Sequence, residues 1–162
     1  MASTRLIIGI FVGIILSFFT VFFFHMESLF AEIRINVGNN LLKAMTDLIG
    51  ANFKFDIIGF FSGTITIYGF FAPQLLAWLF IGYISGTIAK GSRRGIIASL
   101  LVVVLDLLIW IILNIISYED LMALFQGPQL TETLGGIISA FLGAFIGGLI
   151  GGLITGPYEE FY

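Results

Sequence analysis

The stretch LGGIISAFLGAFIGGLIGGLITG, residues 134–156, is apolar and places a small residue at every fourth position in two neighbouring rows. Residues four apart lie on the same side of an α-helix, so the two rows form one broad face with almost no side chains. A second helix can approach such a face closely and gain dispersion contacts along its length. The stretch therefore predicts a tightly packed helix. The rows are Gly135, Ser139, Gly143, Gly147, Gly151 and Thr155, and Gly136, Ala140, Ala144, Gly148, Gly152 and Gly156.

The composition of the whole chain indicates a membrane protein. Of its 162 residues, 59% are hydrophobic and 10% are charged, against about 45–50% and 25% in soluble domains. A transmembrane helix needs about 20 apolar residues to cross a hydrocarbon core of about 30 Å. Four runs reach or approach that length: residues 6–24, 73–89, 95–116 and 134–155. We therefore predict an all-α integral membrane protein, a single polytopic domain over residues 1–162 built as a four-transmembrane-helix bundle in the lipid bilayer.

Basic residues set the predicted orientation. Lys90, Arg93 and Arg94 lie in the short turn between the second and third runs, and Arg5 precedes the first. The positive-inside rule places both segments in the cytoplasm. Both termini are then cytoplasmic, and residues 25–72 and 117–133 lie outside. The first run is interpreted as a retained signal anchor, because no small-x-small cleavage site follows it. We therefore expect a multi-pass protein of the cell membrane.

The outer segment, residues 25–72, is too amphipathic for a flexible loop. Apolar residues recur at helical spacing between positions 29 and 49, which predicts short helices within residues 27–50 that cover the outer ends of the spans. Residues 52–57 alternate apolar and polar, and residues 64–68 are β-branched or aromatic, which predicts a small β-hairpin within residues 52–68. A re-entrant apolar loop is the alternative for this second part.

Glycine pairs four residues apart also occur in the first run, at Gly9 and Gly13, and in the second, at Gly82 and Gly86. Such pairs are typical of close helix contacts in membranes. Two interpretations are open. The glycine faces pack the helices of one monomer, or they continue into a neighbouring subunit of a homo-oligomer or of a hetero-complex with other membrane subunits.

One carboxyl interrupts the most apolar run. Asp106 lies near the middle of residues 95–116, where an Asp costs about 2.5–3.5 kcal/mol. Ser99 and Asn114 fall on the same side of the helix and complete a candidate intramembrane polar site. Because desolvation disfavours the charged form, we expect Asp106 to be neutral and turned toward another helix. The open readings are a hydrogen-bonded lock on helix register, a proton or cation relay, and a contact to a partner subunit.

No catalytic constellation emerges from the sequence. The chain has one histidine, His25, and no cysteine, which excludes thiolate sites and sites with several imidazoles. The net charge is −3 and the basic residues are scattered, so a nucleic acid is not an expected partner. We predict a protein that is not an enzyme and has no cofactor, no metal site and no catalytic residue.

The block GYISGTIAKGSRRGIIASLL, residues 82–101, precedes the glycine-rich last run. It resembles small, uncharacterised multi-span membrane proteins common in archaea, in which a glycine-containing helix, a GSRRG-type turn and another helix form a hairpin. The resemblance implies a four-helix membrane fold and no known activity. Two functional hypotheses follow. The first is a structural or accessory subunit that packs through glycine faces into a larger assembly, and the second is a small oligomeric channel or transporter for protons or small cations that uses Asp106.

Overall fold

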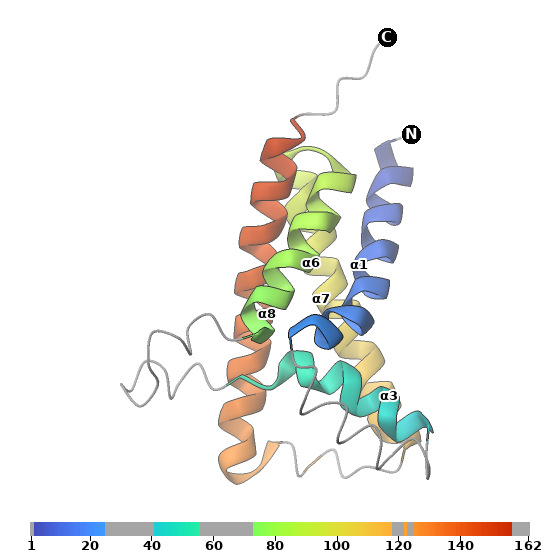
Figure 1. Cartoon of the computed structure of the whole chain (residues 1–162), viewed down its shortest axis with the longest axis vertical. Coiled ribbons are helices and arrows are strands. Elements are labelled where there is room, and N and C mark those ends of the chain that lie inside the picture. The colour runs from blue at the N-terminus through green and yellow to red at the C-terminus, as the bar shows by residue number, and fades with distance from the viewer. Residues whose placement is uncertain (1, 25–40, 56–72, 118–121, 123–124, 157–162) are drawn as a thin grey trace, which may run out of the picture.

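The computed structural model describes residues 2–24, 41–55, 73–117, 122 and 125–156. Within these residues all regular structure is helical. Four long helices run side by side, and a short helix with a 3-10 turn crosses below two of them (Figure 1). The elements are α1 (Ala2–Phe24), α3 (Leu41–Gly50), η1 (Ala51–Phe53), α6 (Pro73–Ala89), α7 (Ser92–Ile116) and α8 (Gly127–Ile154).

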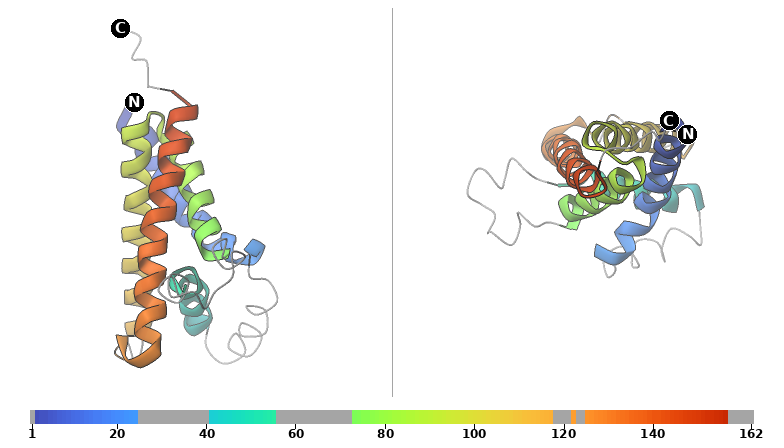
Figure 2. Two further views of the ribbon diagram at one scale, coloured as in Figure 1. Left: turned by 90° about the vertical axis from the view of Figure 1, so that its left-hand side faces the viewer. Right: turned by 90° about the horizontal axis from the view of Figure 1, so that it is seen from above.

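Helices α6 and α7 lie between α1 and α8, and each of them contacts both. The view from above in Figure 2 shows this arrangement, with α1 and α8 on opposite sides. Helices α7 and α8 extend further than α1 and α6, and α3 and η1 occupy the space below the two shorter helices (Figures 1 and 2). The short segment therefore completes the core along the lower part of α7 and α8.

Proline and glycine set several helix ends. Helix α6 begins at Pro73, and α8 has a proline in its first turn, where the missing N–H costs no helical hydrogen bond. The turn between α6 and α7 passes through Gly91, with φ of 89°. Helix α8 ends at Ile154. Gly156, two residues later, has a φ of 71° that glycine readily adopts, and its N–H bonds to the carbonyl of Leu153 at 3.2 Å.

An aromatic cluster anchors the crossing segment. Phe53 of η1 is fully buried between two tryptophans, with ring centroids 5.3 Å from Trp78 of α6 and 5.5 Å from Trp110 of α7. Gly50 lies against the Trp110 ring, and an added Cβ there would lie 2.6 Å from its indole nitrogen. Aromatic pairs at these distances add to the stabilisation by burial. The segment predicted as an outer cap is thus part of the main core.

The prediction of four transmembrane spans is wrong. Among the described residues, two helices are long and apolar enough to cross a membrane, Ser92–Ile116 and Gln129–Ile154. The apolar parts of the other two long helices, Thr4–Thr20 and Gln74–Ala89, do not exceed 17 residues. At 1.5 Å per residue they reach about 26 Å, less than the hydrocarbon core of about 30 Å. The hydropathy of the sequence did not distinguish the two helices that are long enough to cross a membrane from the two that are shorter.

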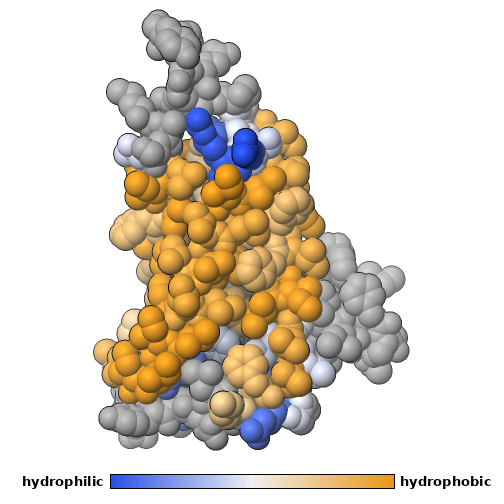
Figure 3. Space-filling model, turned by 180° about the vertical axis from the view of Figure 1, so that it is seen from behind, coloured by the Kyte–Doolittle hydropathy of each residue, from blue (hydrophilic) through white to orange (hydrophobic). Residues whose placement is uncertain are grey.

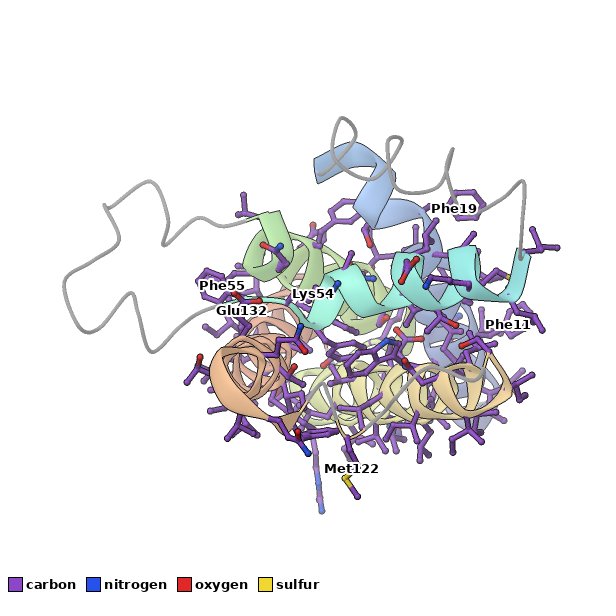
Figure 4. The ribbon with its side chains drawn as sticks, turned by 90° about the horizontal axis from the view of Figure 1, so that it is seen from below. Phe11, Phe19, Lys54, Phe55, Met122 and Glu132 are labelled. Carbon is purple, nitrogen blue, oxygen red and sulfur yellow. The ribbon has the colours of Figure 1, made fainter. Side chains whose placement is uncertain are left out.

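The predicted hairpin is not found in the part of residues 52–68 that the structure describes. Asn52 and Phe53 belong to η1, and Phe55 donates its N–H to the carbonyl of Glu132 in α8 at 3.3 Å instead of to a second strand. Figure 4 shows Phe55 and Glu132 next to one another at α8. Residues 56–68 lie outside the described residues, as do residues 27–40 of the predicted outer helices. The remaining ten, 41–50, form α3.

Candidate functional site

Close contacts at two glycines bring α1 against α6 and α7. An added Cβ at Gly9 would lie 2.9 Å from the carbonyl oxygen of Ser85. One at Gly13 would lie 2.5 Å from the Ser85 hydroxyl and 2.5 Å from Cγ2 of Val102. Only a glycine fits there without a shift of a neighbouring helix. One turn further along both helices, Ser17 follows Gly13 and Asp106 follows Val102, so these two residues are placed at the same level.

The Asp106 carboxyl is enclosed at this level. The residue is 0% exposed, and neither of its oxygens forms a hydrogen bond of ordinary geometry. The Ser17 side chain of α1 faces the carboxyl, but its hydroxyl donates to the carbonyl of Ile14 at 2.8 Å. The Ser85 hydroxyl of α6 is also buried without a hydrogen bond. An ionised carboxylate without a partner is very costly in such an interior, whereas a protonated one is much less so.

The other two residues of the predicted polar site are buried on α7 but do not join Asp106 through hydrogen bonds. The Ser99 hydroxyl donates to the carbonyl of Ile96 at 3.0 Å, and the Asn114 amide donates to the carbonyl of Trp110 at 2.8 Å. Both side chains therefore bond to their own helix. Ser99 lies against Gly148 of α8.

Sequence reasoning missed Ser17 as the residue that faces Asp106, and it missed the polar residues that bond to Ser17. The carbonyl of Ser17 accepts hydrogen bonds from the Asn52 amide at 2.9 Å and from the Thr20 hydroxyl at 3.3 Å. Ser17, Thr20 and Asn52 are all buried. One signal was available, because Ser17 continues the row of Gly9 and Gly13 that predicts a helix contact. Nothing local marked Asn52, which reaches this position through the fold of α3 and η1.

The glycine rows of α8 divide between two neighbours. Gly143, Gly147 and Gly151 of the first row face α6. An added Cβ at Gly147 would lie 2.8 Å from the backbone nitrogen of Tyr83, and one at Gly151 would lie 3.0 Å from that of Thr87. Such distances require the helices to move apart. Gly135 of the same row is buried.

The second row lies where three helices meet. An added Cβ at Gly148 would lie 2.7 Å from the carbonyl oxygen of Gly95 in α7, and one at Gly152 would lie 2.5 Å from that of Gly91. An added Cβ at Gly86 of α6 would likewise lie 2.5 Å from the carbonyl oxygen of Gly148. Backbones of α6, α7 and α8 are therefore in contact around Gly148, which leaves no room for a side chain.

The ends of the second row have other roles. Gly136 lies directly under the carbonyl of Phe53, so η1 rests on α8 at this point. An added Cβ at Gly82 of α6 would lie 2.6 Å from the carbonyl oxygen of Ala144. Gly156 has no heavy atom within 4 Å of an added Cβ and lies beyond the end of the helix, so it does not take part in helix packing. The described glycine faces of α8 are thus covered by elements of the same chain.

Chemically, the buried carboxyl can take up and release a proton. Among the described residues, no three His, Cys, Asp or Glu side chains lie close enough to hold a metal ion. Comparison with protein-family models, with curated proteins and with solved structures finds no significant match. The resemblance to small archaeal membrane proteins therefore stays a prediction, and the functional argument depends on the site itself.

Proposed function

We propose that the protein is an integral membrane protein that acts as a small channel or transporter for protons, with Asp106 as the residue that binds and releases the proton. The observation that carries the proposal is a fully buried carboxyl whose oxygens form no hydrogen bond of ordinary geometry within the described part of the chain, with the Ser17 side chain facing it. A buried polar group left without a partner calls for an explanation. A lock on helix register would use a directed hydrogen bond to a neighbouring helix. The Ser17 hydroxyl that faces the carboxyl donates to the carbonyl of Ile14 in its own helix, so exchange of a proton explains the arrangement better.

The surface of the two longest helices supports a membrane location. Only 33% of the most apolar window of α7 and 44% of that of α8 is buried inside the chain, whereas the core helix of a soluble protein is mostly buried. Figure 3 shows a continuous apolar surface on the α7 side of the molecule. Soluble monomers rarely expose apolar patches of such extent. Exposed apolar side chains of the two helices include Ile97, Leu101, Leu108, Ile112 and Ile116 of α7, and Ile138, Phe141, Phe145, Ile150 and Ile154 of α8.

We further propose that the end of the molecule with the α6–α7 turn faces the cytoplasm. Lys90, Arg93 and Arg94 lie at this end, and the start of α1 and the end of α8 are beside them (Figure 1). The positive-inside rule favours this orientation. Helices α7 and α8 then cross the membrane as a hairpin, and both chain termini are cytoplasmic. Asp106 lies within the span of α7.

The proposal is tested by proton flux into proteoliposomes that contain a pH-sensitive dye. We expect flux above that of empty vesicles for the wild-type protein. Asp106→Asn keeps the size and hydrogen-bonding capacity of the side chain but has no titrating proton, so this variant is expected to fold and to lose the flux. Ser99→Ala serves as the matched control, because Ser99 is buried on the same helix but faces α8.

Three results would contradict the proposal: no flux with wild-type protein, full flux with a folded Asp106→Asn variant, or equal loss with Ser99→Ala. The first of these would favour the alternative function, a structural or accessory subunit of a membrane complex. That alternative is less well supported because the described glycine faces contact the chain's own elements. Its own test is the mass of the protein in mild detergent, where a strict monomer without a co-purifying partner would argue against it.

A further inference from the structure

A cavity of about 630 Å³ lies at the cytoplasmic end of the proposed orientation, between the α6–α7 turn and the end of α8. Three of its lining residues are cations, Lys90, Arg93 and Arg94, and none of the described residues that line it is acidic. Arg93 is exposed, and Arg94 and Lys90 are half-buried. A hollow with this concentration of positive charge attracts an anion.

The wall of the cavity is fixed by backbone contacts. The N–H of Gly91 donates to the carbonyl of Gly152 in α8 at 3.2 Å. The two glycines are so close that a Cβ at Gly152 would lie 2.5 Å from the Gly91 carbonyl oxygen. The turn that carries the cations is therefore attached to α8, and the cavity is a built feature of the packed helices.

The position of the cations is energetically unusual in two ways. Lys90 has φ of 54° and is the one non-glycine residue with positive φ among the described residues, a conformation that costs a non-glycine residue free energy. Arg93 and Arg94 lie in the first turn of α7, which has no acidic residue. Cations there are repelled by the positive end of the helix dipole. A bound anion would relieve this repulsion.

The cavity also has an apolar side. Ile97 of α7 and Leu153 of α8 line it and are 42% and 59% exposed. Figure 3 shows a hydrophilic patch at this end directly above the apolar surface. A free anion would gain nothing from the apolar wall, whereas an anionic lipid would place its phosphate among the cations and its acyl chains along the helices.

From this arrangement we propose that the cavity binds the phosphate headgroup of one anionic phospholipid. The proposal uses the membrane location argued above, but it concerns a different site from Asp106 and does not require proton transport. Lys90, Arg93 and the N-terminal turn of α7 hold the phosphate, and Ile97 and Leu153 contact the start of the acyl chains.

The test is native mass spectrometry of the full chain, delipidated in mild detergent and titrated with phosphatidylglycerol or with phosphatidylcholine of the same acyl chains. We expect one phosphatidylglycerol to bind about tenfold more tightly than phosphatidylcholine. Arg93→Gln should weaken this binding about fivefold. Arg5→Gln is the matched control, because it removes one cation at the same end of the molecule from a residue that does not line the cavity.

Lys90→Gly is a second test variant, for which we expect lipid binding to weaken while thermal stability is kept or increased. Glycine adopts the positive φ without cost, so the melting temperature should stay equal or rise, while phosphatidylglycerol binding falls about fivefold. Equal binding of the two lipids would overturn the proposal, as would equal weakening by Arg5→Gln and Arg93→Gln. Full displacement of the lipid by millimolar glycerol phosphate would also overturn it and would identify a site for a free phosphate. Failure of proton flux would leave all of these results unaffected.

Discussion

The side-chain amide of Asn52 donates a hydrogen bond of 2.9 Å to the main-chain carbonyl of Ser17, 35 residues earlier in the chain. The main-chain carbonyl of Asn52 in turn accepts a hydrogen bond of 2.8 Å from the indole N–H of Trp78. One residue of η1 thus joins α1 to α6 at the level of Asp106. This connection fixes the position of Ser17, the residue of α1 that faces the carboxyl.

Asn52→Ala should destabilise the protein by about 1–3 kcal/mol, because the change removes a buried donor and leaves the space of the amide empty. The measurement is unfolding in detergent, followed by tryptophan fluorescence. Both tryptophans of the chain contact Phe53, so they report directly on this region. Gln126→Ala, at an exposed position before α8, is the control and should change the stability little. Equal stability of the two variants would contradict the importance of the Asn52 bridge.

Gly136→Ala should detach η1 from α8. The added methyl group would overlap the carbonyl of Phe53, and overpacking of this kind costs about 1–3 kcal/mol. We expect the emission of Trp78 and Trp110 to shift to longer wavelength and the amides of residues 51–55 to exchange faster with deuterium. Leu134→Ala, on the exposed side of the same turn of α8, should leave both measurements close to wild type. An unshifted emission spectrum for Gly136→Ala would show that η1 does not rest on this glycine.

The helices themselves could largely be predicted from the sequence. The periodic glycines of residues 134–156 predicted a helix that packs through a flat face, and the structure has α8 in this place. Its start is earlier than expected, at Gly127, because the polar residues before position 134 continue the helix beyond the apolar run. Hydropathy identifies apolar surface, but it cannot locate the last helical residue or decide whether a helix crosses a membrane.

The surroundings of Asp106 could be predicted only in part. Burial of the carboxyl against another helix was expected from its cost in an apolar setting, and the residue is 0% exposed. Ser99 and Asn114 were expected to form a polar site with Asp106 because they lie on one side of α7. Their side chains instead bond to carbonyls of their own helix. Ser17 and Asn52 come from distant parts of the chain. Helical periodicity describes one element at a time and contains no information on which neighbour it faces.

Gly147→Ala should loosen the contact between α8 and α6. Its Cβ would meet the carbonyl of Leu79 and lie 2.8 Å from the nitrogen of Tyr83, so the two backbones must separate. We expect a loss of about 1–3 kcal/mol in unfolding free energy. Ile146→Ala alters the adjacent exposed position and is the control, with a smaller effect. The mass in detergent is measured alongside: a change of mass without loss of stability would indicate that this glycine face contacts another subunit instead.

The orientation and the membrane location can be tested together with single cysteines, because the chain contains none of its own. Gln126→Cys, just before α8, should react with a membrane-impermeant maleimide in intact cells. Ser92→Cys, at the start of α7, should react only after the membrane is permeabilised, since the positive-inside rule places this end in the cytoplasm.

Leu108→Cys is the decisive position of this series. Its side chain is 47% exposed on the surface of α7, so water would reach it if the helix belonged to a soluble protein. In a hydrocarbon environment the reactive thiolate does not form, and we expect no labelling before or after permeabilisation. Labelling after denaturation in sodium dodecyl sulfate, which dissolves the membrane, is the control for an intact thiol. If the folded Leu108→Cys protein reacts as fast as Gln126→Cys, α7 faces water and the membrane location of the chain is wrong.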